Sequence, residues 1–137
     1  MSTPIAGEFN TTPPTVGSGQ KVNVQTDPAG RLLVLSGGIA YETVAAGQSA
    51  QILGATGAVG DYLTGIVIVP ATTSPGAVSI TDGNGSAITI FTGGASSVLT
   101  LHSWFVPILS KCVNATTPGW KVTTGTNVSA IGLGTFT

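Results

Sequence analysis

Residues 77–91, AVSITDGNGSAITIF, contain two segments of alternating apolar and polar residues on either side of a turn. Val78 and Ile80 alternate with polar residues before the turn, and Ile88 and Ile90 do so after it. A period of two places the apolar side chains on one face of a strand, and Asp-Gly and Asn-Gly pairs favour tight hairpin turns. This stretch therefore predicts an antiparallel β-hairpin within an all-β fold.

Further short β-rich segments flank this hairpin on both sides. The strongest covers residues 62–69, which are rich in β-branched side chains and stop at Pro70. Other expected strand segments are residues 39–45, 49–53, 97–101, 104–106 with 108–109, 120–124 and 127–136. No segment has the composition of a helix. About eight short strands, separated by turns roughly every 8 to 12 residues, predict a jelly-roll-like antiparallel β-sandwich.

The first 36 residues have a different composition. Residues 1–20 are interrupted repeatedly by Pro and Gly, which predicts an extended arm. Two alternating segments, 21–25 and 31–35, flank a turn at Asp27-Pro28-Ala29-Gly30, which predicts a short hairpin. With Gly37-Gly38 as the candidate boundary, we expect an anchoring arm and hairpin over residues 1–36 and the β-sandwich over residues 37–137.

Charge is scarce along the whole chain. Only 7% of the 137 residues are charged, against about 25% in an average soluble domain. With 4 Lys and Arg residues there is no basic field for nucleic acid, and no apolar run approaches the roughly 18 residues that span a membrane. The N-terminus lacks the pattern of a secretory signal. A net charge of -1 gives copies of the chain little mutual repulsion, which favours assembly.

The chain is poor in catalytic and metal-binding side chains. His102 is the single histidine and Cys112 the single cysteine, too few for a zinc site, and we expect Cys112 to be a small buried hydrophobe. An acid–base pair would need two of the five carboxylates to converge: Glu8, Asp27, Glu42, Asp61 and Asp82. We therefore expect no enzyme, no catalytic residue, no metal and no cofactor.

Three weaker patterns each have a structural interpretation that is favoured over a binding site. Residues 82–85 resemble the start of a calcium loop but lack the later Glu, so a turn is favoured. Residues 54–60 are glycine-rich but are not followed by the Lys-Ser/Thr of a phosphate loop. Exposed aromatic residues would support sugar binding, with Trp120 as the position to test, but aromatic residues are more often core or interface residues. The aromatic candidates are Tyr41, Tyr62, Trp104, Phe105 and Trp120.

Part of the N-terminal region resembles a module found in virion proteins of tailed bacteriophages. The residues that carry the resemblance are Thr12-Pro13-Pro14-Thr15-Val16-Gly17-Ser18-Gly19-Gln20, Val24-Gln25-Thr26-Asp27 and Gly30-Arg31-Leu32-Leu33-Val34. The module runs Pro-Pro, Gly-Gln, an apolar residue with Gln-x-Asp, and Gly-x-Leu-x-Val. The match covers about 25 of the 137 residues, and its specificity lies in the order and spacing of these pieces.

The resemblance implies a structural protein of the phage particle, made in the host cytoplasm and located on the virion surface. We expect a capsid decoration (cement) protein that binds the major capsid protein or another virion protein and forms homo-oligomers, with a trimer favoured. Its partner-binding residues would be the apolar and proline residues of the N-terminal region: Ile5, Phe9, Pro13, Pro14, Val16, Val22 and Val24. The alternatives are a tail, collar or head-fibre component, or a carbohydrate-binding β-sandwich for host attachment.

Overall fold

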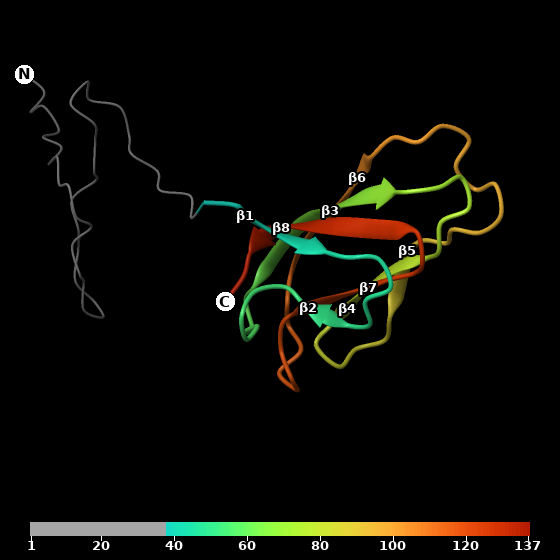
Figure 1. Cartoon of the computed structure of the whole chain (residues 1–137). Coiled ribbons are helices and arrows are strands. Elements are labelled where there is room, and N and C mark those ends of the chain that lie inside the picture. The colour runs from blue at the N-terminus through green and yellow to red at the C-terminus, as the bar shows by residue number, and fades with distance from the viewer. Residues whose placement is uncertain (1–37) are drawn as a thin grey trace, which may run out of the picture. The chain divides into compact units, whose positions relative to one another are not determined.

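The computed structural model describes residues 38–137, shown in colour in Figure 1. The predicted arm and hairpin, with the seven proposed partner-binding residues of the N-terminal region, lie outside the described residues.

The described residues form eight strands in two four-stranded antiparallel sheets, which Figure 1 shows as two layers. One sheet has the order β1-β8-β3-β6 and the other has the order β2-β7-β4-β5. The first sheet contains β1 (Ala40–Val44), β8 (Val128–Thr135), β3 (Tyr62–Pro70) and β6 (Trp104–Lys111). The second contains β2 (Gln51–Ile52), β7 (Trp120–Thr124), β4 (Val78–Asp82) and β5 (Ile88–Phe91). The predicted all-β sandwich is confirmed.

The hairpin of residues 77–91 is present as β4 and β5, with Ile80 paired to Ile88 and Val78 paired to Phe91. It is the one pair of consecutive strands within a sheet of the described domain. Every other connection between consecutive strands, from β1 to β8, crosses from one sheet to the other.

The predicted strand at residues 97–101 is wrong. This segment is a loop between β5 and β6, and its backbone is bonded to another loop instead of a strand ladder. The Val98 N–H donates to the Thr73 carbonyl at 3.2 Å, and the Ser96 N–H donates to Ser74 Oγ at 3.0 Å. Val98 is buried, whereas Leu99 is 91% exposed. The loop thus follows the end of the sandwich because residues 71–76 supply its partners.

The core lies between the sheets and takes one residue in two from the central strands. Its fully or almost fully buried side chains are Val44, Leu53, Leu63, Ile66, Ile68, Val78, Ile80, Cys112, Trp120, Val122, Val128 and Ala130. In β3 the register shifts between Leu63 and Gly65, so that Thr64 is an extra residue relative to β8. Because such a bulge changes the parity of a strand, both Leu63 and Ile66 face the core.

Candidate interaction surface

The outer faces of the two sheets differ in polarity. On sheet β2-β7-β4-β5, the outward residues are polar: Thr81 lies opposite Lys121, and Ser79 lies opposite Thr123 and Thr89. This is the usual arrangement for an antiparallel sheet, with one face on the core and one face in water. Water can solvate these polar side chains in a single copy.

The outer face of sheet β1-β8-β3-β6 is mostly apolar, and it also carries the polar residues Thr43, Ser129 and Thr135. We call it the apolar face and define it by the outward residues Tyr41, Val67, Val69, Phe105, Ile131 and Leu133. The strand register places these side chains next to one another, with Val67 opposite both Ile131 and Phe105 and with Tyr41 opposite Leu133. Tyr41 is 73% exposed and Phe105 is 46% exposed, whereas Val67, Val69, Ile131 and Leu133 are half-buried. A contiguous exposed apolar surface on a domain indicates a site of interaction.

Phe105 is positioned by a glycine on the neighbouring strand. A Cβ atom added to Gly65 would collide with the Phe105 ring, so the ring lies over the bare backbone of β3. An aromatic ring placed over a strand glycine covers backbone that would otherwise be open to water. The consequence is a fixed aromatic anchor at the β6 side of the apolar face.

Strand β6 forms one edge of this sheet but is poorly suited to pairing with another strand. Pro107 has no N–H, and Leu109 has a φ of 55°, at the place where the register of β3 and β6 shifts. Proline and bulges are devices that protect sheet edges from strand addition. A partner on this side would therefore bind through side-chain packing, with Phe105 and the 63% exposed Leu109 available for contact.

The three carboxylates of the described region hold loops in place. Glu42 Oε2 accepts a hydrogen bond from the Gly54 N–H at 3.2 Å. Asp61 is 5% exposed, and its carboxylate accepts the Ala58 N–H at 2.9 Å and the Thr137 hydroxyl at 2.7 Å. Asp82, in the turn of residues 82–85, accepts the backbone N–H groups of residues 113 and 114 at 3.1 and 3.3 Å. Each acid thus has a structural partner of its own.

Cys112 lies beside Asp82, and each changes the pKa of the other. Burial raises the pKa of the Cys112 thiol, and its hydrogen bond to the Asp82 carboxylate raises it further. Desolvation pushes the pKa of Asp82 upward, but hydrogen bonds from the thiol and from the two backbone amides outweigh it and leave that pKa lowered. The 1% exposure of Cys112 confirms the expectation of a small buried hydrophobe.

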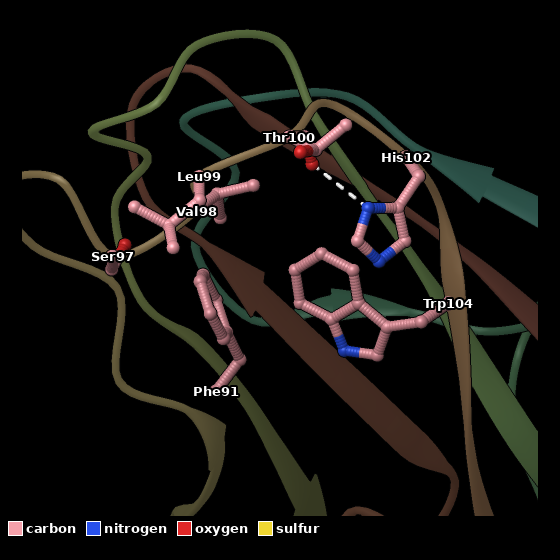
Figure 2. Close-up of a pocket in the computed structure, with 7 residues that line it drawn as sticks. All are labelled: Phe91, Ser97, Val98, Leu99, Thr100, His102 and Trp104. Atoms are coloured by element: carbon pink, nitrogen blue, oxygen red, sulfur yellow. Dashed lines mark hydrogen bonds between the residues drawn. The ribbon is translucent and has the colours of Figure 1, made fainter.

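The end of the sandwich carries a hollow of about 470 Å³, drawn in Figure 2. It is lined by residues from β5, from the following loop and from the start of β6: Phe91, Ser97, Val98, Leu99, Thr100, His102 and Trp104. The rings of Phe91 and Trp104 meet edge to face, with centroids 5.1 Å apart. The sequence did not predict this hollow, because four of its lining residues lie in the segment 97–101 that was expected to be a strand.

The remaining sequence candidates have structural roles. Trp120 is 4% exposed and donates its indole N–H to the Asp61 carbonyl at 3.3 Å, so its ring is not accessible as a sugar-binding surface. In the glycine-rich loop, the N–H groups of Thr56 and Gly57 both donate to the Thr137 carbonyl at 2.9 Å. Within residues 38–137, no group of His, Cys, Asp and Glu could hold a metal ion. No helix there has the length and apolar character needed to cross a membrane.

No protein-family model, curated protein or solved structure matches this chain.

Proposed function

We propose that this chain is a structural protein of a phage particle, a capsid decoration protein that binds the outer surface of the head and stabilises it through contacts with capsid subunits and with copies of itself. The observation that carries this proposal is the apolar face, since its six outward side chains remain exposed or half-buried in an isolated domain. The N-terminal resemblance to phage virion proteins supplies the setting.

The charge distribution supports assembly. None of the six residues that define the apolar face is charged, and Glu42, on the adjacent edge strand, is bonded to a loop amide. A partner that covers these six side chains would not leave a buried charge unpaired, which is the costly error at protein interfaces; Lys111, exposed at the end of β6, lies outside this set. Copies of a chain with a net charge of -1 also repel one another little.

The strand order supports a jelly roll, which we infer as the finer topology of the sandwich. In a jelly roll, eight strands form two four-stranded sheets and successive connections cross between them. Here all connections but the β4–β5 hairpin do so. Viral capsid domains and lectins both use this architecture, so the topology favours the proposal only as a fold-level analogy.

A binding experiment with phage heads tests the proposal. Heads that lack this protein would be incubated with the purified chain, and the bound copies would be counted after sedimentation. We expect saturation at a copy number that follows the number of capsid subunits. Saturation at a few copies, at one vertex or on tails, would favour the alternative of a tail, collar or head-fibre component.

Two matched variants connect the experiment to the apolar face. Tyr41→Ser removes an aromatic side chain from an edge strand with little effect on the core, because Tyr41 is 73% exposed. Truncation of a tyrosine that anchors an interface costs about 2 kcal/mol, so we expect binding or self-association to weaken by about tenfold or more. Thr89→Ala, on the polar face, is the control and should bind normally. Equal behaviour of the two variants would contradict a role for the apolar face.

A further inference from the structure

The hollow at the end of the sandwich has the size and composition of a small-molecule site. Its volume of about 470 Å³ lies within the range of roughly 300 to 1,000 Å³ that is usual for ligand pockets. Figure 2 shows the Phe91 and Trp104 rings facing the loop of residues 97–100, with His102 beside the indole. The ring centroids of His102 and Trp104 are 5.7 Å apart. The hollow is thus largely apolar, with aromatic and aliphatic side chains and a few polar groups around it.

The hydrogen bonding of His102 determines what its ring offers to a ligand. Nδ1 lies 2.8 Å from the Thr100 carbonyl oxygen, which can only accept a hydrogen bond. Nδ1 therefore carries the proton, and Nε2 of the neutral ring is a hydrogen-bond acceptor. Within residues 38–137, Nε2 and the hydroxyls of Ser97 and Thr100 make no hydrogen bond. Three polar side-chain atoms around the hollow are therefore open to a ligand.

The lining excludes two classes of ligand by their chemistry. No Asp, Glu, Lys or Arg lines the hollow, so a charged ligand would lose its hydration without gaining a counter-charge. A purely apolar ligand would cover polar atoms without giving them partners, which costs about 1–3 kcal/mol for each such group. The fitting ligand is neutral, has an apolar ring face and carries hydroxyl groups around its edge.

We infer that this hollow binds a neutral sugar unit of the pyranose type. The C–H groups on one face of a pyranose are weakly positive and pack against the negative face of an aromatic ring such as Trp104 or Phe91. Its hydroxyl groups donate to His102 Nε2 and exchange hydrogen bonds with the Ser97 and Thr100 hydroxyls. The inference is independent of the proposed virion role, because it rests on different residues at the end of the sandwich.

A titration of the full chain with single sugars tests the inference. Backbone amide signals of ¹⁵N-labelled protein would be followed by NMR with glucose, galactose, mannose and N-acetylglucosamine, each up to about 50 mM, a range suited to millimolar affinities. Sorbitol is the matched control, since it has hydroxyl groups but no ring. We expect at least one sugar to shift the signals of residues 97–104 in a saturable way, and sorbitol to leave them unchanged.

Two variants separate the polar contact from general packing. His102→Phe keeps an aromatic ring but removes both nitrogens, and the loss of one hydrogen bond should weaken sugar binding by about tenfold. Ser103→Ala changes an exposed neighbour that does not line the hollow, and its affinity should match that of the wild type. Comparable melting temperatures would show that both variants fold.

Three results would overturn the inference: no shifts with any of the sugars, equal shifts with sorbitol, or unchanged affinity in His102→Phe. If the same amide signals shift with protein concentration alone, the hollow is a contact between copies of the chain. That result would also reject the sugar site, but it would be compatible with the proposed decoration role.

Discussion

Two isosteric substitutions, one on each sheet, test which side chains are buried in a single copy of the domain and which become buried only when it associates. Val78 on β4 is fully buried between the sheets, whereas Val67 on β3 points outward, half-buried, on the apolar face. Val→Thr keeps the shape of the side chain and its preference for strands, and replaces one methyl group with a hydroxyl. The difference between Val78→Thr and Val67→Thr therefore measures the environment of each side chain.

The expected magnitudes follow from burial. In Val78→Thr the new hydroxyl enters an apolar core that provides no hydrogen-bond partner for it, which lowers the free energy of unfolding by about 1–3 kcal/mol. For a domain of this size, each kcal/mol corresponds to about 4–8 °C in Tm. In Val67→Thr the hydroxyl reaches water in a single copy, so the change should stay within about 0.5 kcal/mol. In a complex, however, Val67→Thr would bury that hydroxyl and weaken association.

The assay combines urea unfolding with sedimentation at several protein concentrations. At low concentration, Val67→Thr should unfold at the same urea midpoint as the wild type, and Val78→Thr should unfold earlier. At high concentration, the wild type should gain stability through association, and Val67→Thr should gain less. If Val67→Thr destabilises the dilute protein as much as Val78→Thr does, the apolar face is not free in a single copy and our interpretation fails.

Four further predictions concern single features of the domain. A Cβ at Gly132 would lie 2.7 Å from Leu53 Cδ1, so Gly132→Ala should lower the free energy of chemical unfolding by about 1–3 kcal/mol. Adding Leu53→Val should restore part of this loss. A Gly132→Ala variant as stable as the wild type would contradict this close packing. Cys112 should not react with a thiol reagent at pH 8 until the chain is unfolded, because it is buried and its pKa is raised; rapid labelling of native protein would disprove this. Because the pKa of Asp82 is lowered in the folded state, its carboxylate stabilises the fold fully above the unfolded pKa of 3.8, and this stabilisation is lost as pH falls toward the folded pKa. The free energy of unfolding of Asp82→Asn should therefore depend less on pH below about 4 than that of the wild type. The same pH dependence in both proteins would exclude this role. Deletion of residues 1–20 should abolish attachment to heads and leave the circular dichroism of the β-sandwich intact; normal attachment would show that this region is not the anchor.

The sequence determined those elements whose structure depends on neighbours along the chain. The hairpin of β4 and β5 follows from local alternation and turn residues, and β3 follows from its run of β-branched residues. Strand β6 continues through Pro107, which a local pattern treats as an interruption, because an edge strand can leave one N–H position unpaired. Residues 97–101 have the same local pattern as a strand, but their partners come from the loop of residues 71–76. Local periodicity carries no information about such distant partners.

The polarity of the two outer faces was decided by the tertiary structure alone. In β8, one parity contains Val128, Ala130, Gly132 and Gly134, and the other contains Ser129, Ile131, Leu133 and Thr135. Hydrophobicity by itself would send Ile131 and Leu133 inward. The structure places the small residues inside instead, because Leu53 from a distant loop fills the space above Gly132. Ile131 and Leu133 consequently face outward and form the centre of the apolar face, a result that depends on how volumes fill the core.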